Sequence, residues 1–295
     1  MFPKNQELKI KQILAEKVHM PVSSLSFSSI GGGSINDTYK ATVNNNQHFF
    51  IKINSAQKFP SLFEKEKNGL HFIAKEKIVK TPVVIDCSIV ENNQMLILEW
   101  IEQGLKSQSF WKIFGEQLAS LHKVSNDHFG FTEDNYMGAL PQVNAHTSSW
   151  IDFFIHHRLQ PQVRIAEDKA LLPSKYIQQF EMLYRKMNTI FDNGNPSLLH
   201  GDLWSGNFMC DENSQPVLID PAVYFGHRSI DLAMSTLFGG FDKSFYEAYQ
   251  YHFPLPGNYR EQWDVSNLYP LLIHLNLFGS GYLHDIATIL KKFTA

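Results

Sequence analysis

The chain has 295 residues, of which 43% are hydrophobic and 19% charged, as expected for a globular enzyme with a sizeable core. Its formal net charge of −3 and its scattered Lys and Arg residues argue against a surface for nucleic acid or an anionic membrane. It has two cysteines, no signal-like N-terminal stretch and no apolar run of membrane-spanning length, so we expect a cytoplasmic protein.

The first hundred residues predict an antiparallel sheet of five short strands with one inserted helix. An amphipathic helix is expected first, at 5–18. Short apolar segments follow it, separated by glycine-rich and asparagine-rich turns. The expected strands are 25–30, 37–43, 49–53, 83–87 and 94–100, and the inserted helix is 59–77.

From about residue 107 the apolar spacing becomes helical. Helices are expected at 109–124, 149–165, 173–191, 229–239, 242–252 and 260–281, with one extended interruption at 198–221. The pattern therefore predicts an α+β fold with two lobes, residues 1–101 and residues 102–295, joined by a hinge near 101–106.

The extended interruption carries the strongest chemical signal. Asp202 and Asn207 share the loop HGDLWSGN, and Asp220 follows a short apolar strand after the turn formed by residues 211–214. A hairpin at that turn would bring Asn207 close to Asp220, and their oxygens suit Mg²⁺. Asp202 would remain to orient a substrate hydroxyl, as phosphoryl transfer requires. The spacing matches the kinase template H-x-D-x-x-x-x-N with a downstream Asp; the alternative is a polar hairpin with surface acids.

The N-terminal half offers candidates for binding ATP. Gly31, Gly32 and Gly33 lie between two strands, where glycine lets the backbone approach phosphates, although a flexible hairpin would look the same. The segment after the last strand, Glu99-Trp100-Ile101, corresponds in the kinase interpretation to the backbone that meets adenine.

Lys52 is a cation within an otherwise apolar strand, and a buried charge needs a partner. Glu64 or Glu66 on the following helix can supply that partner, and in kinases such a pair positions the phosphates. The alternative is an edge-strand lysine that faces water.

Two departures from protein kinases favour a small-molecule acceptor. Gly201 replaces the arginine that commonly pairs with a phosphorylated activation loop. Only residues 221–228 separate Asp220 from the next helix, which is too short a segment to hold a peptide substrate.

The sequence resembles the fructosamine kinases, also called ketosamine-3-kinases, from about residue 22 to 285. The HGDxxxxN loop is shared with aminoglycoside phosphotransferases and choline kinases, whereas Trp204 and the distal LFGGF are more specific marks. The matching segments are LLHGDLWSGN (198–207), IDP (219–221), YFGHRSIDLAMSTLFGGF (224–241), GGGSIN (31–36), GEQLASLH (115–122), GALPQVN (138–144) and W…FF…RL (150–159).

This resemblance implies transfer of the ATP γ-phosphate to the sugar 3-hydroxyl of a ketosamine, on a small amine or a protein lysine. The phosphorylated adduct then decomposes, so the family acts in deglycation. By position, the resemblance makes Asp202 the catalytic residue, makes Asn207 and Asp220 the ligands of Mg²⁺, and pairs Lys52 with Glu66 rather than Glu64.

Other residues are assigned weaker roles. Trp204 is either a wall of the sugar pocket or part of the core, and His200 and Asp231 are expected to brace the loop. His122 is expected to be structural, whereas residues 142–144 and Arg158 are candidates for acceptor contacts. The sequence leaves open the preferred sugar, the oligomeric state and the choice between a free amine and a protein adduct. It also leaves open whether Asp202 acts as a base or only orients the hydroxyl, and a kinase for another alcohol or a nucleotide-binding pseudokinase remains an alternative.

Overall fold

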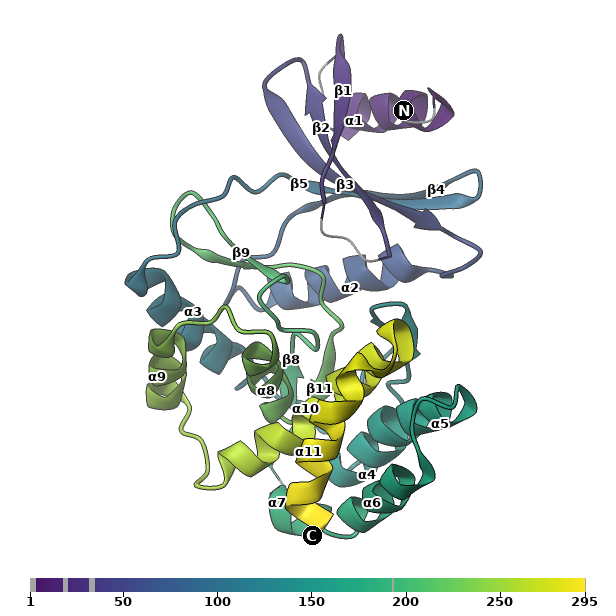
Figure 1. The fold of residues 1–295 in the computed structure, drawn as a ribbon. Helices are drawn as coiled ribbons and strands as arrows, with labels where there is room; N and C mark the ends of the chain where they lie inside the picture. Colours follow the sequence, from purple (N-terminus) through teal and green to yellow (C-terminus); the bar gives the residue numbers. More distant parts are fainter. Residues whose placement is uncertain (1–3, 18–20, 32–34, 193, 295) are drawn as a thin grey trace.

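The computed structural model describes residues 4–17, 21–31, 35–192 and 194–294, so Gly32, Gly33 and the last residue of the first expected helix lie outside the described residues. Five strands form one antiparallel sheet in the order β1-β2-β3-β5-β4, which confirms the predicted sheet (Figure 1). The strands are β1 (Leu25–Ser29), β2 (Asp37–Val43), β3 (Gln47–Ser55), β4 (Val84–Val90) and β5 (Asn93–Glu99).

Alternating side chains of the sheet are buried by a helix on each face. Helix α1 (Lys4–Lys17) packs Ile10 and Leu14 against Ile97 of β5. Helix α2 (Leu62–Lys75) packs Phe63 on the opposite face, against Leu96 of the same strand. Figure 1 shows the sheet between these helices, with α2 facing the rest of the molecule. Because successive side chains of a strand point to opposite faces, both faces of the sheet carry apolar side chains, and each face needs a helix to cover it.

Helix α2 is also tied to the C-terminal half. Lys65 Nζ lies 2.7 Å from Oε2 of Glu133, and Asn68 donates a 2.9 Å hydrogen bond to Oε1 of the same carboxylate. A Cβ added at Gly69 would lie only 3.2 Å from a methyl carbon of Val223, so glycine permits a close approach there. We call the contact of Lys65 and Asn68 with Glu133 the α2 clamp.

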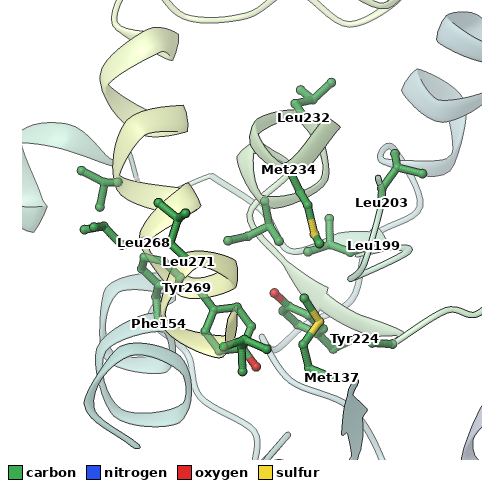
Figure 2. Packing of buried hydrophobic residues seen from close by; sticks show 14 of the residues in the cluster. Met137, Phe154, Leu199, Leu203, Tyr224, Leu232, Met234, Leu268, Tyr269 and Leu271 are labelled. Atoms are coloured by element: carbon green, nitrogen blue, oxygen red, sulfur yellow. The ribbon is translucent and has the colours of Figure 1, made fainter. Parts of the chain in front are cut away.

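The C-terminal half is mainly helical around one large hydrophobic core. Figure 2 shows part of this core, where Met137, Leu199 and Tyr224 from short strands lie near helical side chains such as Met234 and Leu271. The helices are α3 (Gln108–Leu121), α4 (Trp150–Phe154), α5 (Gln160–Asp168), α6 (Ser174–Tyr184), α7 (Met187–Ile190), α8 (Ser229–Leu237), α9 (Lys243–His252), α10 (Tyr259–Phe278) and α11 (Leu283–Thr294). Short two-stranded ribbons lie between them: β6 (Asn135–Met137) with β7 (Leu140–Gln142), β8 (Ser197–Leu199) with β11 (Tyr224–Gly226), and β9 (Phe208–Cys210) with β10 (Pro216–Leu218).

The helix boundaries differ from the expected ones in several places. The expected helix 149–165 contains a π-helical turn, Ile155–Leu159, between α4 and α5, and the expected helix 173–191 is two helices. Helix α10 stops before Gly279, whose φ of 92° is incompatible with a right-handed helix. Helix α11 was not anticipated, although its buried Ile286, Ile289 and Leu290 have helical spacing.

The π-helical turn presents Arg158 to the interior. Its guanidinium donates 2.6 Å hydrogen bonds to the carbonyl of Val143 and to Oδ1 of Asn144, and it lies 4.1 Å from the ring centroid of Tyr224. Arg158, Gln142 and Asn144 are all at most 1% exposed. Gln142, Asn144 and Arg158 are therefore too deeply buried to contact an acceptor, so the expectation is wrong for these three residues, whereas Val143 is 42% exposed.

Replacing Arg158 with methionine should lower the free energy of unfolding by about 3 kcal/mol, because buried oxygens would lose their hydrogen-bond donor. Urea denaturation measures this change. The matched control is Arg164→Met, on exposed surface of α5, which should change the free energy of unfolding by less than about 0.5 kcal/mol. Equal effects of the two substitutions would contradict the structural role of Arg158.

Candidate active site

A hairpin brings Asn207 and Asp220 together. Phe208 of β9 pairs with Leu218 of β10, and the Ile219 N–H donates to the Asn207 carbonyl at 3.1 Å, one residue before Asp220. The turn is closed by Oδ1 of Asp211, which accepts backbone N–H groups from the turn. The hairpin expected between the HGDLWSGN loop and Asp220 is thus present.

Asn207 is oriented by Asp202. Its Nδ2 donates to Oδ2 of Asp202 and to the Asp202 carbonyl, both at 2.9 Å. An amide that donates through nitrogen in this way keeps its oxygen for another partner. Burial, together with the negative charge of Asp220, raises the pKa of Asp202 to about 7.

The loop before Asp202 is held by Asp231 of α8. The carboxylate accepts the backbone N–H groups of His200 at 2.8 Å and Gly201 at 2.9 Å, and it lies 3.1 Å from Nε2 of His122. Burial by itself would raise the pKa of Asp231, but the hydrogen bond and charge of His122 outweigh burial and lower it. Asp231 and His122 therefore brace the loop from inside the core.

His200 links the loop to the strand that leads to Asp220. Its Nε2 donates to the carbonyl of Ile219 at 2.8 Å, which leaves Nδ1 to accept the Asp202 N–H at 3.2 Å. Gly201 has a φ of 85°, and a Cβ there would lie 2.0 Å from the Ala222 carbonyl oxygen. An arginine at position 201 is thus incompatible with the backbone packing of this loop.

Lys52 of β3 links the sheet to Glu66 of α2 and to Asp220, which follows β10. Its Nζ lies 2.7 Å from Oε1 of Glu66 and 2.5 Å from Oδ1 of Asp220, and its side chain is only 2% exposed. Burial would lower the pKa of Lys52, but the charges of Asp220 and Glu66 outweigh it and raise the pKa. Glu64 instead faces solvent beside Lys67, so the preference for Glu66 as the partner is confirmed.

These groups line one cleft between α2 and the C-terminal half. The cleft brings together six side chains singled out in the sequence: Lys52, Glu66, Asp202, Trp204, Asn207 and Asp220. Glu99, Trp100 and Ile101 are not among the residues that line this cleft, and Trp100 packs under the ammonium of Lys40 at 4.3 Å. Gly31 ends the described segment before the glycine turn.

Sequence reasoning missed the other wall of the cleft. This wall comes from the end of β6 and from the C-terminal part of α10, and includes Met137, His274, Leu277 and Phe278. A histidine among apolar residues of α10 was the only visible signal, because helical spacing alone assigns such residues to the core.

The donor atoms fit Mg²⁺ held together with phosphate. Among the described residues, no group of three or more His, Cys, Asp or Glu side chains could hold a metal. Mg²⁺ commonly takes one or two protein oxygens plus phosphate oxygens and waters. The Asn207 amide oxygen and the 40%-exposed carboxylate of Asp220 supply such a pair beside the cleft.

The five-stranded sheet, the paired lysine and the Asp–Asn loop with its following Asp define a phosphotransferase of the protein-kinase-like class. The chain belongs to the fructosamine kinase family, whose model matches residues 6–295. It is 36% identical over 287 residues to a probable ketoamine kinase of Synechocystis, covering 96% of this chain and 95% of the relative. It is also 36% identical to the chloroplastic protein-ribulosamine 3-kinase of Arabidopsis thaliana, covering 90% of this chain and 81% of the relative.

Solved structures agree with this assignment. A Haemophilus somnus protein assigned as a fructosamine-3-kinase superposes with a TM-score of 0.87 at 27% identity, covering 97% of each chain. A type I macrolide 2′-phosphotransferase superposes with a TM-score of 0.57 at 14% identity, covering 99% of this chain and 98% of that one, which shows a shared fold alone. None of the helices in the described residues combines the length and the apolar character that a membrane span requires.

Proposed function

We propose that the protein is an ATP-dependent kinase that phosphorylates the 3-hydroxyl of the sugar in ketosamines such as fructosamines and ribulosamines. The observation that carries the proposal is the single cleft in which Asp202 lies with the Lys52–Glu66 pair, Asn207 and Asp220. Curated relatives are named ketoamine kinase and protein-ribulosamine 3-kinase, which supports the choice of acceptor.

The cleft residues divide the work of phosphoryl transfer. Lys52, with one ammonium donor left beyond Glu66 and Asp220, would contact the phosphates of ATP. Asn207 and Asp220 would hold Mg²⁺, which when bound neutralises phosphate charge. Asp202 would accept a hydrogen bond from the acceptor hydroxyl and take up its proton, aligning the oxygen with the γ-phosphate.

The remaining expected contacts complete this assignment. Trp204 lines the cleft two residues after Asp202 and would face the C–H surface of the sugar. We propose that Gly31, Gly32 and Gly33 cover the phosphates and that Glu99-Trp100-Ile101 meets adenine. Residues 1–101 would then act as the nucleotide lobe and residues 102–295 as the acceptor lobe, in a cytoplasmic enzyme of deglycation.

A coupled assay of Mg²⁺- and ATP-dependent turnover tests the proposal with four acceptors: a ribulosamine, a fructosamine, an aminoglycoside and choline. We expect turnover of at least one ketosamine at a kcat/KM at least about a hundredfold above those of the other alcohols. Turnover of only an aminoglycoside or choline would overturn the acceptor assignment. Nucleotide binding without turnover of any acceptor would instead indicate a pseudokinase.

A further inference from the structure

The connection between α8 and α9 carries the LFGGF motif, which the chemistry of the cleft does not explain. Leu237 is the last residue of α8, and residues 238–241 follow it; we call these four residues the FGGF connection. Gly239 and Gly240 both have positive φ values, of 69° and 89°. Such a backbone is costly for residues other than glycine, so the connection has a specified shape.

The FGGF connection packs on the tight turn that carries Trp204 and Asn207. The N–H of Asn207 donates a 3.0 Å hydrogen bond to the carbonyl of Trp204, which closes this turn. Phe238 lies against Trp204, with ring centroids 5.9 Å apart. Phe241 lies against Phe208, the first residue after the turn, with ring centroids 4.9 Å apart. The two ends of the connection therefore contact the two ends of the turn.

Gly240 makes a still closer approach at the middle of the turn. A Cβ at this position would lie 2.6 Å from Cβ of Ser205. Carbon atoms in good contact are about 3.5–4.0 Å apart, so either Ser205 or the connection would have to move. A Cβ at Gly239, by contrast, would meet nothing within 4 Å. The two neighbouring glycines thus share a positive φ, but only Gly240 needs to be glycine because of the turn.

The turn places two groups of the proposed active site at once. Trp204, just before Ser205, lines the cleft as the proposed sugar wall. Asn207, two residues after Ser205, lines the same cleft and would hold Mg²⁺. A displacement of Ser205 would therefore shift the acceptor wall and the metal ligand together. Misplacement of a reacting group by about 1 Å can cost about a hundredfold in rate, so the position of this turn has a large effect on catalysis.

We propose that the FGGF connection is a positioning element of the active site and that Gly240 is its central positioning residue. Gly240 touches neither substrate nor metal; it acts through Ser205, by letting the connection seat the turn where Trp204 and Asn207 face the cleft. This inference rests on the proposed ketosamine kinase function. It gives the LFGGF motif a role through its contact with the HGDLWSGN loop.

Steady-state kinetics of Gly240→Ala with a ketosamine test the inference. We expect the KM for the ketosamine to rise at least about tenfold and the Mg²⁺ concentration for half-maximal rate to rise about threefold, because the turn is displaced. A variant that is only less stable would lose kcat through its folded fraction and keep both constants. Gly239→Ala is the matched control, because it adds a side chain at a positive φ without a contact. Both constants should then stay within about twofold of wild type.

A compensating substitution tests whether the contact itself is responsible. Ser205→Gly removes the Cβ that Gly240→Ala would meet, so the double variant should match Ser205→Gly alone within about twofold in both constants. Equal constants for Gly240→Ala and Gly239→Ala, or a double variant no better than Gly240→Ala, would overturn the positioning role.

The double variant also decides the case in which Gly240→Ala gives no folded protein. A folded double variant with the constants of Ser205→Gly would support the contact, and a double variant that also fails to fold would overturn it. Absence of ketosamine turnover by the wild-type enzyme would overturn the proposed function itself, a result that no behaviour of the variants can produce.

Discussion

Replacing Asp202 with asparagine should lower kcat for a ketosamine by about a thousandfold or more. Asparagine has nearly the same shape, but its side chain cannot take a proton from the acceptor hydroxyl, and its amide can turn a donor toward Nδ2 of Asn207. Steady-state kinetics measure the loss, and titration with an ATP analogue should show a Kd within about threefold of wild type, since Asp202 is not assigned to the nucleotide.

The matched control for this substitution is Glu212→Gln, which removes an acid from the exposed turn of the same hairpin. It should leave kcat within about twofold of wild type. If Asp202→Asn also kept kcat at that level, Asp202 would not be the group that aligns the acceptor, and the cleft would need another acid in that role.

Replacing Lys52 with methionine should reduce stability and activity together. The change leaves the 11%-exposed carboxylate of Glu66 without its cation, so we expect the free energy of unfolding to fall by about 3 kcal/mol. Turnover should fall by at least about a hundredfold, because the phosphates lose a positioning cation. Urea denaturation and the coupled assay measure the two losses separately.

The double variant Lys52→Met with Glu66→Gln separates the two roles of Lys52. Removing the unpaired charge of Glu66 should recover most of the lost stability, whereas turnover should stay at the level of the single variant. Recovery of turnover together with stability would show that Lys52 acts only as a structural cation. Lys67→Met, on the same side of α2 as solvent-facing Glu64, should leave both quantities near wild type.

Local sequence patterns predicted much of the fold. The near-continuous apolar runs of β3 and β5 and the turn signals between strands predicted the five-stranded sheet, because strands that helices bury on both faces read as unbroken apolar runs. The spacing from Asp202 to Asn207, with the polar turn before Asp220, predicted the hairpin. A lysine in an apolar strand required a partner, and Glu66 supplies it.

The features of the site that the sequence did not predict depend on packing between segments that are distant in the sequence. Nothing near His274 or Phe278 shows that the end of α10 reaches the HGDLWSGN loop, which follows only from the packing of α8 against α10. Arg158 looked like a candidate for substrate contact, because arginine is usually exposed or paired with an acid. Its partners are instead buried backbone and amide oxygens, which no residue pattern identifies in advance.

The α2 clamp has a consequence for control of the enzyme. Protein kinases are switched by moving the corresponding helix, which makes or breaks the lysine–glutamate pair. Here α2 is tied to the sheet side through Glu66 and Lys52, and to the C-terminal half through Lys65 and Asn68 on Glu133. Because α2 is bonded on both sides, the Lys52–Glu66 pair is held together without a separate activating step. The reaction rate in the cell is then expected to depend on the concentrations of the substrates and on the amount of the protein.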